Sequence, residues 1–157
     1  MKGLSFLLAL MLMASLCHAK PLDADNIHER VHAERQALKR YFEETDKLMN
    51  VFNHKKEKLR DATFLLDTIN RVQERTGSEG YLLAVYDCVT NVAAQHDAEQ
   101  LIRDHYADLA RLTATDAKSA HLVARDSKSK ELAALATKVE GDIQKIADRS
   151  KTLSTNE

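Results

Sequence analysis

The sequence predicts an all-α protein, an elongated, mostly antiparallel bundle of three or four helices with a long first helix. Its 157 residues include one Pro and four Gly, so few positions would break a helix. Hydrophobic residues make up 44% and charged residues 30%, a balance typical of chains that fold around a core. In addition, the segment 27–76 contains neither Pro nor Gly and carries one apolar stripe at helical spacing.

The expected first helix runs from Ile27 to Thr76. In a heptad count that starts at Val31, apolar residues fill most a and d positions, and further apolar residues flank them on both sides. A stripe this wide suits packing against two or more partner helices. Glu34, Thr45 and Lys55 interrupt it. They either reach solvent and fix the local register, or form a buried polar site.

Breaks in the apolar pattern predict the remaining elements. Thr76–Gly80 reads as the first interhelical connection, because Gly77 suits a helix stop and Ser78 a new N-cap. The next helix starts near Tyr81. It either continues through Asp97 or kinks there.

The C-terminal part of the chain carries a thinner apolar stripe. A capping box at Thr113–Asp116 predicts a turn, and the polar segment 125–131 is a loop or a solvated helical turn. The last helix starts near Leu132 and frays from Ser150 onward.

The N-terminus has the features of a secretory signal peptide over residues 1–19. Lys2 supplies a positive charge, Leu4–Leu16 is apolar but too short to span a bilayer, and Ala19 suits cleavage. Residues 20–157 would then form a single helical bundle domain. Processing as a lipoprotein at Cys17 is the alternative. We therefore expect a secreted or periplasmic protein without an integral membrane segment in its mature chain.

Cleavage after Ala19 would leave Cys88 as the one thiol of the mature chain, which excludes an internal disulfide. Cys88 lies beside Val85 and Val89 in an apolar stretch. This position favours a small buried residue over an intermolecular disulfide or a reactive thiol.

One motif can carry metal chemistry. His28-Glu29-Arg30-Val31-His32 fits H-E-x-x-H, in which two histidines four apart on a helix share zinc and the glutamate acts as a base. Over these five residues the chain resembles the zincin metallopeptidase signature. His28 and His32 are therefore candidate metal ligands, and His121 joins them if the chain folds back about Gly77. The alternative is two solvent-facing histidines at a charged helix start.

These patterns favour a non-catalytic protein that acts through protein–protein interaction, in a structural or signalling role. No phosphate-binding glycine loop, nucleophile elbow or zinc-spaced cysteine pair occurs, so we expect neither an enzyme nor a cofactor. A formal net charge of −1 argues against nucleic acid as a partner. The expected partner is an unidentified protein, with a homodimer through the first helix as one arrangement. Carriage of lipid or a small apolar ligand on amphipathic helices is the alternative.

Overall fold

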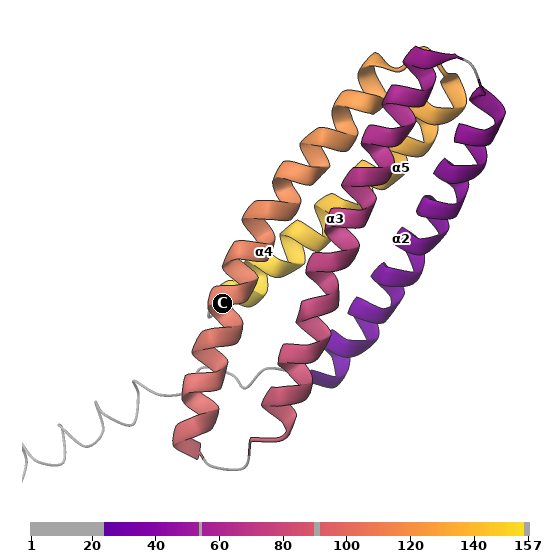
Figure 1. The fold of residues 1–157 in the computed structure, drawn as a ribbon. Coiled ribbons are helices and arrows are strands. Elements are labelled where there is room, and N and C mark those ends of the chain that lie inside the picture. The colour runs from indigo at the N-terminus through magenta and orange to yellow at the C-terminus, as the bar shows by residue number, and fades with distance from the viewer. Residues whose placement is uncertain (1–23, 54, 90–91, 156–157) are drawn as a thin grey trace, which may run out of the picture.

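The computed structural model describes residues 24–53, 55–89 and 92–155, and within them four helices reverse direction in turn (Figure 1). The helices are α2 (Ala24–Phe52), α3 (Lys56–Asp87), α4 (Val92–Asp126) and α5 (Lys130–Ser154). No strand occurs in the described part of the chain, where 94% of the residues are helical. The predicted all-α antiparallel bundle is thus confirmed, and it has four helices.

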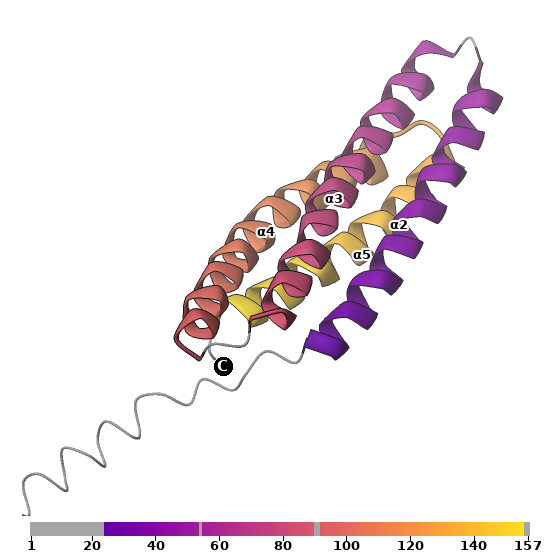
Figure 2. The same ribbon diagram turned by 60° about the horizontal axis from the view of Figure 1, so that its bottom comes forward.

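The first helix, however, ends earlier than the sequence predicted. The segment 27–76 divides into α2 and the first part of α3, which lie side by side as a hairpin (Figures 1 and 2). Asn53 follows α2 with a φ of 41°, a left-handed conformation that Asn adopts more easily than most residues. Apolar residues before and after this turn occupy a and d positions of the same heptad count. The sequence pattern therefore predicted one continuous helix.

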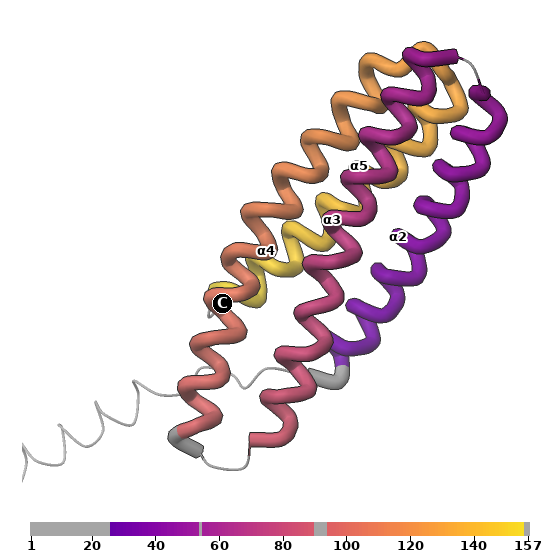
Figure 3. The backbone as a smooth tube through the Cα atoms, in the orientation of Figure 1, coloured from indigo at the N-terminus to yellow at the C-terminus, as the bar shows by residue number. Residues whose placement is uncertain are grey.

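Two predicted turns are helical instead. Thr76–Gly80 lies inside α3 and Thr113–Asp116 inside α4, and the trace runs straight through both (Figure 3). Thr76 and Thr113 are fully buried, and each hydroxyl donates a hydrogen bond to a carbonyl one turn earlier in its own helix. Packing against neighbouring helices therefore outweighs the turn propensity of these residues.

The connection between α4 and α5 is a loop, which is one of the two alternatives predicted for 125–131. Helix α4 ends at Asp126 and α5 begins at Lys130. The Ser129 hydroxyl accepts a hydrogen bond of 3.4 Å from the backbone N–H of Leu132, and so caps α5. Helix α4 is continuous at Asp97, which agrees with the alternative that had no kink there. The helix predicted from Tyr81 is instead interrupted earlier, because α3 ends at Asp87 and α4 begins at Val92.

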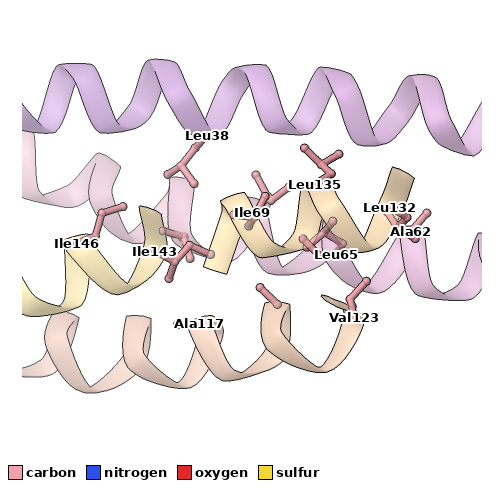
Figure 4. Packing of buried hydrophobic residues seen from close by; sticks show 14 of the residues in the cluster. Leu38, Ala62, Leu65, Ile69, Ala117, Val123, Leu132, Leu135, Ile143 and Ile146 are labelled. Atoms are coloured by element: carbon pink, nitrogen blue, oxygen red, sulfur yellow. The ribbon is translucent and has the colours of Figure 1, made fainter. Parts of the chain in front are cut away.

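Buried apolar residues form two clusters along the bundle axis. The larger one draws on all four helices at the end where α2 meets α3 and α4 meets α5 (Figure 4). The smaller one lies toward the other end, and its buried members are Ile27, Val31, Leu83, Ile102, Tyr106 and Leu109. Much of the apolar surface of the four stripes is buried between helices, which is the main stabilising contribution.

Two predictions concern the N-terminus and the membrane. The expected signal peptide, residues 1–19, lies outside the described residues. In the part of the chain that the structure covers, no helix combines the length and the apolar character needed to cross a bilayer.

Candidate functional site

Helices α2 and α5, which run beside each other in Figure 2, contact along a seam of paired positions. Each step advances seven residues along α2 and moves back seven along the antiparallel α5, as expected for two helices that keep one face together. The seam has three levels, formed by Glu34 with Arg149, Tyr41 with Asp142, and Leu48 with Leu135.

At the first level Arg149 is held by two carboxylates. Its guanidinium donates hydrogen bonds of 2.9 and 2.7 Å to both oxygens of Glu34, and of 2.5 and 3.1 Å to both oxygens of Glu79 on α3. The side chains of Arg149 and Glu79 are only 8% and 1% exposed. Burial alone would lower the pKa of Arg149, but these bonds raise it above its ordinary value. Arg149 therefore stays positively charged and links three helices.

Helix α4 adds Tyr106 to this cluster. Arg149 lies over the aromatic ring of Tyr106, with 5.9 Å between the guanidinium carbon and the ring centroid. Burial and the negative charge of Glu79 raise the pKa of Tyr106. Its hydroxyl has no hydrogen-bond partner of good geometry among the described residues. Glu34 is thus part of a polar cluster, partly buried with its side chain 20% exposed, whereas Lys55, another interruption of the stripe, is exposed to solvent.

At the second level Tyr41 of α2 donates a 2.7 Å hydrogen bond to Asp142 of α5. Burial, together with this bond, raises the pKa of Tyr41 to about 12. Burial would also raise the pKa of Asp142, but hydrogen bonds from Lys145 and Tyr41 lower it. Polar contacts therefore close the first and second levels of the seam.

At the third level the seam opens into a groove of about 320 Å³. One face of α2 forms one wall and one face of α5 the other, and the apolar residues Leu48, Val51, Ala134 and Leu135 line it between charged side chains. We call this feature the α2–α5 groove. Its lining residues are Glu44, Lys47, Leu48 and Val51 on α2, and Glu131, Ala134, Leu135 and Lys138 on α5.

The charged residues of the α2–α5 groove differ in whether they already have partners. Glu131 accepts a 2.9 Å hydrogen bond from Ser129. A backbone hydrogen bond and, second to it, the bond from Ser129 lower the pKa of Glu131. Glu44, Lys47 and Lys138 form no hydrogen bond or ion pair with any part of the chain that the structure describes. Three charged side chains beside exposed apolar surface are therefore available to a ligand.

The predicted metal ligands lie at the other end of α2. Nε2 of His28 is 3.4 Å from the carboxylate of Asp87 on α3. His32 lines a separate hollow of about 400 Å³ together with Arg35, Gln36 and Lys39. Within the described ranges, no three His, Cys, Asp or Glu side chains group so that they could hold a metal ion. Zinc binding by His28 and His32 stays a prediction that these positions do not test.

His121, the suggested third ligand, lies in a different part of the bundle from His28 and His32. Nδ1 of His121 lies 3.1 Å from Glu140, in the contact between α4 and α5. Because the hairpin turns at Asn53 and not at Gly77, His32 lies in the first turns of α2 and His121 in the last turns of α4. The start of α2 and the end of α4 lie at opposite ends of the bundle (Figure 1). The prediction of a site formed by three histidines was therefore wrong.

A second buried charge was not predicted from the sequence. Asp116 on α4 is 3% exposed and accepts hydrogen bonds from Arg71 and Arg75 of α3. Both arginines lie one turn apart on α3, and Asp116 falls at helical spacing with the buried residues Leu109, Ala120 and Val123 of α4, which is the signal that could have indicated the contact. With both arginines as partners, Asp116 serves to align α3 with α4.

Comparisons with known proteins find no significant match for this chain. No protein-family model matches this chain, and neither a curated protein nor a solved structure is significantly similar to it.

Proposed function

We propose that this protein is a non-catalytic, secreted or periplasmic helical protein that acts by binding another protein through the α2–α5 groove. The observation that carries the proposal is the change along the seam between α2 and α5. Polar contacts close two levels, whereas the third exposes apolar surface beside unpaired charges. Apolar grooves bordered by polar groups are typical of recognition sites.

The packing of the bundle supports a binding role for the folded protein. Both apolar clusters are covered by the chain itself, with residues such as Leu65, Ile69 and Leu83 fully buried. The helices therefore need no lipid to bury their apolar faces. This favours a preformed binding surface over a bundle that opens on a membrane.

Carriage of a small apolar ligand is the second candidate, and the size of the α2–α5 groove favours it. Its volume of about 320 Å³ falls at the lower end of the ~300–1,000 Å³ usual for small-molecule sites. A short acyl chain over Leu48 and Leu135, with its anionic end near Lys47 or Lys138, fits the lining. Such a ligand would be carried without unfolding.

The location of the protein rests on the N-terminal sequence. The positive charge at Lys2, the short apolar segment Leu4–Leu16 and the small residue Ala19 are features that direct a chain to secretion. Expression of the full chain with a tag at its C-terminus, followed by mass spectrometry of the exported protein, tests this part. A mature N-terminus at Lys20 is the expected result.

The binding role is tested on the chain that starts at Lys20. Far-ultraviolet circular dichroism should show high helicity and a cooperative thermal transition, unchanged by neutral or anionic vesicles. Selection of a displayed random-peptide library on the same protein should enrich sequences whose binding is lost in Val51→Asp. A large gain of helix on vesicles, or saturable binding of a fatty acid with no peptide enrichment, would support the carrier instead.

A further inference from the structure

We infer that a hollow between α2 and α3 binds a phosphate monoester, a phosphoryl group with two negative charges on an organic carrier. We call this feature the α2–α3 hollow. Its lining residues are His32, Arg35, Gln36 and Lys39 on α2, and Gln73 on α3. The inference goes beyond the proposed protein binding, because the α2–α3 hollow shares no lining residue with the α2–α5 groove.

The lining of the α2–α3 hollow carries positive charge and no negative charge. Arg35 and Lys39 lie one turn apart on α2, and no Asp or Glu lines the hollow. Within the described chain, the ion pairs of α2 are those of His28 and Glu34, so neither lining cation has a carboxylate partner. Two permanent positive charges therefore face the same hollow.

Acidic residues close in the sequence do not pair with these two cations. Glu34 precedes Arg35, but both of its carboxylate oxygens accept hydrogen bonds from Arg149 on α5. Glu29, Glu43 and Glu74 are exposed, lie outside the lining, and form no ion pair in the part of the chain that the structure covers. Solvent and salt screen such exposed charges, so the hollow keeps its positive character.

Arg35 reaches across the contact between the two helices. Its Nη2 atom lies 3.8 Å from the position that a Cβ on Gly77 of α3 would take. Gln73, the lining residue of α3, lies one turn before Gly77. Arg71 and Arg149 also reach a neighbouring helix, and both donate hydrogen bonds to carboxylates there. Arg35 takes a similar bridging position without an acidic partner among the described residues.

The donor groups of the α2–α3 hollow match a phosphoryl group. A phosphate monoester carries about −1.5 to −2 charges at pH 7 and three acceptor oxygens, whereas a carboxylate carries only one charge. A guanidinium binds two phosphate oxygens at once, and an ammonium acts as a point charge beside them. The amides of Gln36 and Gln73 and the imidazole of His32 can donate further hydrogen bonds.

The size of the α2–α3 hollow leaves room for the organic part of the ligand. Its volume is about 400 Å³, within the ~300–1,000 Å³ usual for small-molecule sites. The phosphoryl group would lie between Arg35 and Lys39, and the carrier would extend over the rest of the hollow.

The test measures binding of phenyl phosphate to the chain that starts at Lys20, by isothermal titration calorimetry at pH 7. Phenyl sulfate is the control ligand, because it has nearly the same shape but a single negative charge. The variants are Arg35→Gln and Lys39→Gln. Arg30→Gln is the matched control, since Arg30 is an exposed arginine of α2 outside the lining. Circular dichroism of each variant checks that the bundle is intact.

We expect phenyl phosphate to bind at least tenfold more tightly than phenyl sulfate, and more weakly at high salt. Arg35→Gln and Lys39→Gln should each weaken binding at least tenfold, whereas Arg30→Gln should leave it unchanged. In nuclear magnetic resonance spectra, the side-chain amide signals of Gln36 and Gln73 should shift on titration.

A second measurement identifies the source of the phosphoryl group. Vesicles of phosphatidic acid present a phosphate monoester, and vesicles of phosphatidylglycerol present a phosphate diester. Sedimentation of the protein with phosphatidic acid vesicles alone, lost in Arg35→Gln, would assign the site to a lipid headgroup. Binding of phenyl phosphate without sedimentation would assign it to a soluble phosphate monoester.

Three results would overturn the inference. Equal binding of phenyl phosphate and phenyl sulfate would exclude recognition of the dianion. Equal losses in Arg30→Gln and Arg35→Gln would show general attraction to a basic helix instead of a site. Absence of both heat and amide shifts would exclude the site altogether. In each case the proposed function stands, because its test depends on Val51 in the α2–α5 groove.

Discussion

Tyr41 donates a 2.7 Å hydrogen bond to Asp142 across the contact between α2 and α5, although 101 residues separate them in the chain. This bond marks the level at which polar contacts along the seam end and the apolar groove begins. The same seven-residue step that leads from Glu34 to Tyr41 leads next to Leu48. A repeating geometry thus presents polar contacts at two levels and a groove at the third.

Stability at alkaline pH should depend on Tyr41. Its pKa in the folded protein is about 12, against ~10 for an exposed tyrosine. A raised pKa means that the folded state retains the proton more tightly. The stabilisation is therefore complete below pH ~10 and is lost as the pH rises toward 12. Urea unfolding of wild type and Tyr41→Phe between pH 9 and 12 should show a steeper loss in the wild type.

The comparison with Tyr41→Phe isolates this residue from other tyrosines, since burial also raises the pKa of Tyr86 and Tyr106. Those two are present in both proteins and contribute equally to each curve. Parallel curves for the two proteins across this pH range would contradict the prediction.

Arg149 should be the most sensitive charged position of the bundle. In Arg149→Met, Glu79 would remain buried without its cation, and breaking such a pair typically costs about 3–5 kcal/mol. Arg60→Met is the matched control, because Arg60 is 80% exposed and changes at such sites are usually within ~0.5 kcal/mol. Urea unfolding at pH 7 measures both. A loss in Arg149→Met no larger than that of the control would show that Arg149 and Glu79 are not paired in a buried site.

The stability of the fold should depend on each buried charge of the cluster having a partner, more than on the presence of the charges themselves. In the variant Glu34→Leu/Glu79→Leu/Arg149→Met, no buried carboxylate is left unpaired. We expect it to regain most of the stability lost in Arg149→Met, as buried ion clusters often tolerate apolar replacement. A triple variant less stable than Arg149→Met would instead mean that the ion pairs themselves stabilise the fold.

The sequence predicted the fold class because apolar residues recur at helical spacing in all four helices. It missed the first turn because the apolar stripe continues through that turn without a change of phase. Phe52 and Ala62 keep one heptad phase across Asn53 and both face the larger cluster, so the stripe holds no sign of the reversal. The run of polar residues from Asn53 to Lys58 was the available signal. Gly77 and Ser78 gave a stronger local turn signal, but Thr76 and Glu79 are buried between helices and keep that segment helical.

The candidate site was harder to predict than the fold. Glu34 stood out as a polar residue in an apolar stripe, yet its partner Arg149 lies 115 residues away and only the register of the bundle brings the two together. The α2–α5 groove arises from the relative height of two antiparallel helices. That height depends on the lengths of two intervening helices, which periodicity fixes only within a few residues.

Gly80 offers a direct test of the corrected helix boundary. In α3, a Cβ at this position would meet no heavy atom within 4 Å. Gly80→Ala should therefore stabilise the protein by about 0.5–1 kcal/mol, since Gly is the poorer residue inside a helix. Gly141→Ala on α5 is the matched comparison, with the same free space. Denaturant unfolding should show gains of similar size, and a loss confined to Gly80→Ala would restore the predicted turn at 76–80.

Cys88 tests the end of the same helix. The sequence favoured a buried thiol beside Val85, but in the structure Cys88 is an exposed free cysteine that follows the last residue of α3. On the chain that starts at Lys20, Ellman's reagent should therefore modify one thiol per molecule in native buffer, at nearly the rate seen in 6 M urea. Cys88→Ser, which should release no thionitrobenzoate, sets the background. Protection of the thiol until the protein unfolds would return Cys88 to the core and displace the C-terminal end of α3.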